Sequence, residues 1–260
     1  MRNIVSAVAV TRCISQSAAH TRLSRVSDEA TDRSATALAE RSNKIRAAVL
    51  GANDGIVSTA GLVLGVAGAT TSTEAILVAG LAGMVAGALS MAAGEYVSVS
   101  SQRDIEQSAV AEETRELADH PDEELAELAE VFEKRGLSKD IAREVAVELT
   151  QRDAIAAHTR EEYGIEPGEY LNPWAAAVSS LLAFTVGALL PLLGMALFDP
   201  GIRVVATFIA VLVALVVTGY VSAKLGGARP HRAVLRNVAG GALAMAVTYG
   251  IGLLIGGAVG

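Results

Sequence analysis

The sequence predicts an all-α integral membrane protein with five transmembrane helices and a three-helix cytoplasmic insert between the second and third. The 260 residues are 52% hydrophobic and only 19% charged, with a mean hydropathy of +0.42. Charged residues concentrate in an N-terminal block (1–42) and an acidic middle (101–172), and the apolar segments 43–100 and 173–260 flank that middle. This pattern is typical of a membrane protein with a soluble insert.

The N-terminal block is expected to be a disordered cytoplasmic tail. Its apolar run, Ile4–Val10, is too short to cross a bilayer, which takes roughly 20 residues. The single cysteine, Cys13, excludes a disulfide within the chain and a thiolate zinc site of the finger type. We expect a free thiol there.

Five segments have the length and apolar character of a membrane span. They are Ile45–Gly68, Ala75–Ser100, Pro173–Leu197, Ile202–Ala223 and Val234–Val259. Glycines recur at four-residue spacing within them, as in Gly51/Gly55 and Gly252/Gly256, and such spacing lets helix backbones approach closely in lipid. The pattern fits packing within one subunit and a subunit interface equally well.

The short loops predict the orientation. The segment Lys224–Arg236 holds four basic residues, whereas the loop between the first two spans, 69–74, holds none. Basic loops stay in the cytoplasm. By parity, the N-terminus and residues 101–172 should be cytoplasmic and the C-terminus should lie outside.

The insert is strongly acidic, with 20 acidic and 8 basic residues and therefore a net charge of −12. This charge disfavours nucleic acid as a partner and attracts cations. Helix signals predict that the second span continues to Ala118. A second helix follows from Pro121 to about Gly136, and a third covers Lys139–Tyr163.

Two successive insert helices each carry a Glu-x-x-Glu pair at the border of the apolar face. The pairs are Glu113 with Glu116, and Glu124 with Glu127. Carboxylates that converge at a packed interface repel one another unless protons or a cation intervene. An ordinary glutamate-rich surface is the competing interpretation, and it fully explains Glu123, Glu130 and Glu133 on the opposite face. Oxygen-only sites suit hard divalent ions such as Mg²⁺, Mn²⁺ and Ca²⁺, with Fe²⁺ as a borderline case.

Two further carboxylates fall inside apolar segments. Asp54 lies in the first span and Glu95 near the end of the second. A charged side chain at the bilayer centre costs roughly 2.5–3.5 kcal/mol even on insertion scales. We therefore expect both residues to serve a proton or cation path.

Two long motifs make the sequence recognisable. They are Ala-Val-Leu-Gly-Ala-Asn-Asp-Gly-Ile-Val-Ser over residues 48–58 and Gly-Glu-Tyr-Val-Ser-Val-Ser-Ser-Gln-Arg-Asp over residues 94–104. Together they closely resemble the vacuolar iron transporter family, and the resemblance covers about residues 43–258. It implies a five-span homodimer that exports Fe²⁺, and often Mn²⁺, from the cytosol in exchange for protons.

The resemblance also implies roles for individual residues. Asp54 and Met91 match residues that line an ion path at the dimer axis, and Glu95 is a candidate to pass ions between this path and the insert. In the insert, five residues match the metal-binding glutamates of the family: Glu113, Glu116, Glu124, Glu127 and Glu162. His158 and Thr159 stand where plant-type members have a pair of methionines. His158 is either a ligand or, as is commoner for a lone histidine on a helix, a solvated side chain.

The expected ions are Fe²⁺, with Mn²⁺ and Zn²⁺ open as alternatives, and no prosthetic group is expected. The remaining partners are protons, membrane lipid and a second copy of the chain. The membrane would be the plasma membrane in a prokaryote or the vacuolar membrane in a eukaryote. The alternative class is a membrane-anchored ferritin-like iron oxidase. Such enzymes use Glu-x-x-His motifs in a four-helix bundle, and this insert has no such motif and only three predicted helices. We therefore expect no enzyme.

Overall fold

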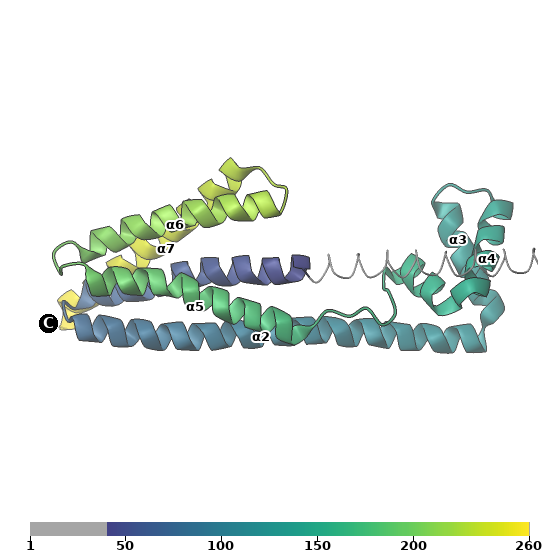
Figure 1. Cartoon of the computed structure of the whole chain (residues 1–260), viewed down its shortest axis with the longest axis horizontal. Helices are drawn as coiled ribbons and strands as arrows, with labels where there is room; N and C mark the ends of the chain where they lie inside the picture. Colours follow the sequence, from purple (N-terminus) through teal and green to yellow (C-terminus); the bar gives the residue numbers. More distant parts are fainter. Residues whose placement is uncertain (1–40, 260) are drawn as a thin grey trace, which may run out of the picture. The chain divides into compact units, whose positions relative to one another are not determined.

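The computed structural model describes residues 41–259, and every regular element in that range is a helix (Figure 1). The described helices are Arg41–Ala69, α2 (Thr73–Asp119), α3 (Pro121–Lys134), α4 (Lys139–His158), the π-helix η1 (Thr159–Tyr163), α5 (Pro173–Leu197), α6 (Arg203–Leu225) and α7 (Pro230–Val259). Of the tail expected over residues 1–42, residues 1–40 lie outside the described range, and Cys13 is among them.

Five of these helices are long and apolar enough to cross a membrane: the first helix, α2, α5, α6 and α7. The protein is therefore a multi-pass membrane protein, as the sequence predicted. Leu64, Leu192, Leu215 and Met245 are buried at the core between these helices. The outward side of α2 exposes large apolar side chains such as Val85, which suits contact with lipid or another apolar surface.

Helix α2 runs without a break from the membrane segment into the insert (Figure 1). Its start is fixed by Ser72, whose side chain accepts a hydrogen bond from the Ala75 N–H at 3.2 Å. It covers 47 residues, and at about 1.5 Å per residue this length far exceeds a hydrocarbon core of about 30 Å. One continuous helix therefore carries both the membrane residue Met91 and the insert residue Glu113.

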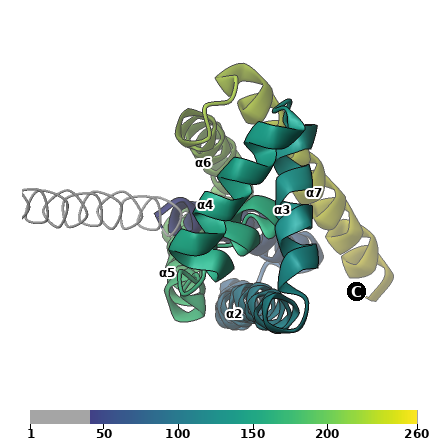
Figure 2. The ribbon, with the colours of Figure 1, turned by 90° about the vertical axis from the view of Figure 1, so that its right-hand side faces the viewer.

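The insert packs α3 and α4 against each other and against the end of α2 (Figure 2). Leu128 and Phe132 of α3 meet Ala142 and Ala146 of α4 in a small apolar core. Figure 2 shows the two helices side by side, next to the insert end of α2.

The last insert helix is interrupted, whereas the sequence predicted one continuous helix over Lys139–Tyr163. Asp153 has extended backbone angles (φ −161°, ψ 97°), and its side chain accepts a hydrogen bond from the Ala156 N–H at 3.0 Å. Asp153 thus caps a new helical segment. That segment continues into η1 and stops at Gly164, whose positive φ of 69° glycine adopts without steric cost.

The glycine pairs pack helices of the same chain together. A Cβ on Gly55 would meet the backbone of Phe184 in α5, and a Cβ on Gly252 would meet the backbone of Gly65 in the first helix. Of the two interpretations that the sequence left open for these positions, packing within the subunit is the one that the contacts support.

Candidate metal sites

Four side chains of the insert converge on one point. Glu113 comes from α2, Glu124 from α3, His158 from the end of α4 and Glu162 from η1, and each offers a ligand atom within 4.8 Å of the others. His158 is central: its Nδ1 lies 3.2 Å from an oxygen of Glu113, 3.2 Å from one of Glu162 and 3.8 Å from one of Glu124. We call these four residues the insert cluster.

The insert cluster is buried, and much of its polar capacity is unused. Glu113 and His158 are fully inaccessible to solvent. Both oxygens of Glu113, both ring nitrogens of His158 and one oxygen of Glu162 form no hydrogen bond within the described residues, although His158 Nδ1 is within ion-pair distance of Glu113 and Glu162. Buried polar atoms without partners are costly, by roughly 1–3 kcal/mol each. A cation held between these atoms would satisfy several at once.

Burial shifts the protonation equilibria of the cluster. Burial, reinforced by the charges of neighbouring glutamates, raises the pKa of Glu113 and that of Glu162 to about 7. The same causes raise the pKa of Glu124. Burial lowers the pKa of His158, and the charge of Glu127 opposes that change. A neutral imidazole is the form that binds metal, and the carboxyl groups would release protons as a metal enters.

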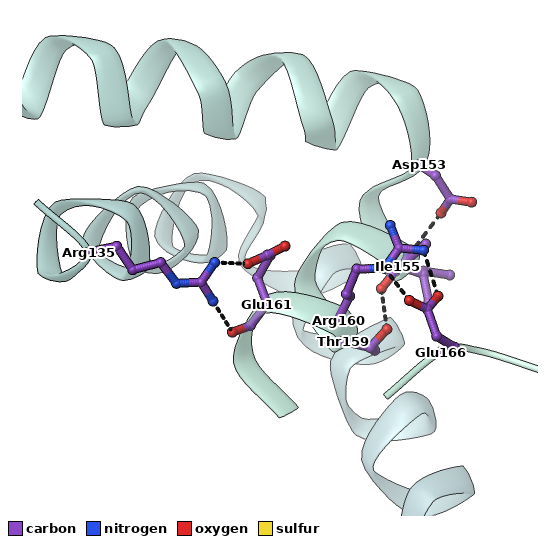
Figure 3. A network of polar contacts seen from close by, with 8 residues as sticks. Arg135, Asp153, Ile155, Thr159, Arg160, Glu161 and Glu166 are labelled. Carbon is purple, nitrogen blue, oxygen red and sulfur yellow. Dashed lines mark hydrogen bonds and ion pairs between the residues drawn. The ribbon is translucent and has the colours of Figure 1, made fainter. Parts of the chain in front are cut away.

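Ion pairs anchor the segment that presents His158 and Glu162 (Figure 3). Arg135, at the end of α3, pairs with the carboxylate of Glu161 and also donates to the Glu161 carbonyl oxygen at 3.3 Å. Arg160 pairs with Glu166, with one N–H···O distance of 2.7 Å. Residues four apart lie on one helix face, so His158 and Glu162 point together into the cluster.

The structure brings together three of the five glutamates assigned by resemblance, namely Glu113, Glu124 and Glu162. Glu116 is half-buried and Glu127 is exposed. They lie outside the cluster, although their charges contribute to its raised pKa values. The commoner interpretation of His158, a solvated side chain, is wrong, because the residue is fully buried. Its four-residue spacing from Glu162 was the available signal.

A second site lies among the membrane helices. Asp54 of the first helix and Met91 of α2 line one cavity of about 330 Å³, together with Arg236 of α7. Asn53 and Asn237 also border it, and the Asn237 side-chain amide donates to Asn53 Oδ1 at 3.0 Å. A carboxylate and a thioether on one cavity suit a borderline divalent metal better than Mg²⁺ or Ca²⁺.

Glu95 does not line this cavity. Its carboxylate is buried, with 8% of the side chain exposed, and it pairs with the guanidinium of Arg46 at 3.0 Å. Arg46 also donates to Asn43 at 3.1 Å. In this structure Glu95 therefore joins the first helix to α2.

Fold and sites together define a polytopic helical membrane protein with an acidic and histidine-containing cluster in its insert. Comparison with known proteins places it more closely. The model of the VIT family matches residues 45–253, so the chain belongs to that family. It is 42% identical over 211 residues to a vacuolar iron transporter of Acanthamoeba castellanii, covering 81% of this chain and 78% of that protein.

Plant relatives give the same result. The chain is 38% identical to vacuolar iron transporter homolog 2 of Arabidopsis thaliana, covering 84% of this chain and 87% of the relative. It is 41% identical to vacuolar iron transporter homolog 1 of Oryza sativa subsp. japonica, covering 83% and 75%. These relatives are named for transport, so the chain belongs to a transporter family and not to an enzyme family.

Proposed function

We propose that this protein exports Fe²⁺ from the cytosol, with Mn²⁺ as a second substrate, in exchange for protons. The observation that carries the proposal is the cavity shared by Asp54 and Met91 among the membrane helices. The names of the relatives support iron as the substrate. An acid at this depth is costly unless it serves an ion, and the thioether favours a borderline metal.

The insert cluster is the proposed loading site. Three carboxylates and one imidazole match the oxygen and nitrogen ligands that Fe²⁺, Mn²⁺ and Zn²⁺ accept. Glu116 and Glu127, together with the net charge of −12 on residues 101–172, would raise the local concentration of cations. His158 is the ligand that resemblance alone does not assign.

The path is proposed to lie at the two-fold axis of a homodimer. Two copies of Asp54 would then face each other and titrate as a coupled pair, so that a proton can leave as metal arrives. With the insert in the cytoplasm, metal is loaded there and released on the other side. An acidic compartment on that side should drive export.

The test is metal flux in liposomes that contain the full-length protein, with an imposed pH gradient. Wild-type protein should move Fe²⁺ and Mn²⁺, faster when the receiving side is acidic. Asp54→Ala should abolish flux while the protein stays folded, because the cation loses its only charged ligand in the cavity. Met91→Ala should slow flux and shift preference toward harder ions.

Glu130→Gln is the matched control, because it removes an exposed insert carboxylate outside the cluster. Its flux should equal that of the wild type. Retention of near wild-type Fe²⁺ flux by Asp54→Ala would overturn the proposed path. If wild-type flux did not depend on the pH gradient, the proposal of proton exchange would be wrong, and the proposed path would still stand.

A further inference from the structure

Arg236 borders the same membrane cavity as Asp54 and Met91. The sequence assigned this arginine only a role in orientation, as one charge of a basic loop. In the structure it belongs to α7, six residues after the first residue of that helix. The cavity therefore has an acidic wall from the first helix and a basic wall from α7.

A hydrogen bond fixes the register of these two walls. Asn237 donates to Asn53 at 3.0 Å across the two helices. Arg236 precedes Asn237 and Asp54 follows Asn53 in the sequence. Asp54 and Arg236 are thus each next to a residue of this hydrogen bond, at about the same level along the two helices.

Neither charged group is committed elsewhere. Within residues 41–259, no ion pair involves the side chain of Asp54 or that of Arg236, neither with each other nor with a third group. Arg236 is exposed on its helix and Asp54 is half-buried. Intramembrane charges pair with one another where they can, and a guanidinium stays charged at any physiological pH. Its long stem lets it reach into the cavity or withdraw from it.

We propose that Arg236 is a tethered competitor of the transported ion. Its guanidinium turns from its exposed position into the cavity to neutralise Asp54 when no metal is bound there, and it withdraws when a divalent cation binds. This inference rests on the proposed function of Asp54. It also gives a basis for selectivity by charge. A monovalent ion that displaces the guanidinium leaves the net charge beside Asp54 unchanged, because one positive charge replaces another. A divalent ion instead brings a second positive charge to the carboxylate.

The test compares Mn²⁺ flux in liposomes for wild type, Arg236→Gln and Arg236→Lys. Mn²⁺ is the probe because it does not oxidise readily. Arg236→Gln should lower the half-saturating Mn²⁺ concentration at least about fivefold, the low end of common coupling between competing ligands. It should also make flux sensitive to inhibition by Na⁺ and K⁺, compared with N-methylglucamine at equal ionic strength. Arg236→Lys keeps the charge and should stay close to wild type in both measurements.

Arg232→Gln is the matched control, because it removes an exposed charge four residues earlier on α7 that does not line the cavity. It should leave half-saturation unchanged. An unchanged half-saturation in Arg236→Gln overturns the inference, and so does an equal shift in Arg232→Gln. If Arg236→Gln does not fold, a half-saturation in Arg236→Lys raised or lowered more than threefold overturns it. Absence of Mn²⁺ and Fe²⁺ flux in wild type would instead overturn the proposed function.

Discussion

His158 shows how one residue changes a site. Its imidazole lies 3.2 Å from two carboxylates and is fully buried. The family resemblance implies a methionine at this position in plant-type members, and a methionine offers a softer and uncharged sulfur. A nitrogen ligand binds Zn²⁺ and Fe²⁺ well and gives the site a proton-sensitive member.

We predict that His158→Ala weakens metal binding to the full-length protein by at least about tenfold, or ~1.4 kcal/mol, because one of four ligands is lost. Titration calorimetry with Zn²⁺ in detergent measures this change. His120→Ala is the control, since His120 is an exposed histidine of the same insert. Equal affinities for the two variants would remove His158 from the site.

The second prediction at this scale concerns pH and stability. In the unfolded chain a glutamate has a pKa near 4.5, whereas Glu113 and Glu162 have a pKa of about 7 when buried. Between these values the folded protein holds more protons than the unfolded chain. The metal-free protein should therefore lose stability as pH rises through this window.

Thermal unfolding in the presence of a chelator, at pH 5.5 and 7.5, measures this effect. Wild type should melt at a lower temperature at pH 7.5, and added Mn²⁺ should reverse the loss. Glu113→Gln should reduce the pH dependence, because its amide does not ionise, whereas Glu130→Gln should keep it. The same pH dependence in both variants would show that the buried carboxyl is not its source.

At the scale of elements, α2 connects the two sites. It contributes Met91 to the membrane cavity and Glu113 to the insert cluster, and its Glu95 lies between them. The pair of Glu95 with Arg46 fixes α2 to the first helix at 3.0 Å. This geometry argues for a joining role, in contrast to the ion-passing role that the sequence suggested.

We expect the two roles to separate in a double-mutant cycle. Arg46→Gln leaves a buried carboxylate without its cation and should lower stability by about 1 kcal/mol, a modest amount because water screens the half-exposed guanidinium. Adding Glu95→Gln to Arg46→Gln should return stability and Mn²⁺ flux to near the wild-type level, because no buried carboxylate is then left without its cation. If Glu95 passes ions instead, Glu95→Gln alone abolishes flux and the double variant stays inactive. Unfolding and Mn²⁺ flux of all four proteins decide between the roles.

At the scale of the whole molecule, the insert and the rest of the chain have net charges of opposite sign. The insert carries −12 and the rest of the chain +5. The basic segment Lys224–Arg236, which covers the end of α6 and the start of α7, predicts the cytoplasmic side, and parity then predicts that the insert lies on the same side. Under the proposed function, an insert that binds cations on that side would serve export and not import.

Labelling of single cysteines in intact cells tests this orientation, in a background where Cys13→Ser removes the native thiol. His120→Cys should react only from the cytoplasm and Thr71→Cys only from outside, and both positions are exposed. Expression of the protein should lower cytosolic Fe²⁺. A rise in cytosolic Fe²⁺, or labelling on the opposite sides, would reverse the proposed direction.

Sequence by itself determined the helical membrane architecture and much of the candidate sites. Apolar runs of membrane length predict spans whatever their partners, and a helical wheel places Glu113 and Glu124 at a buried face because both depend only on local periodicity. The pairing of Asp54 with Met91 followed from a family resemblance. None of these inferences needed distances between helices.

Tertiary structure decided which side chains meet. It placed His158, on the segment that follows the break at Asp153, inside the insert cluster. It left Glu127 of α3 outside the cluster. It joined Glu95 to Arg46, 49 positions away, and it placed Arg236 at the cavity that Asp54 lines. Such contacts depend on how helices distant in sequence pack, and no local pattern in the chain encodes that packing.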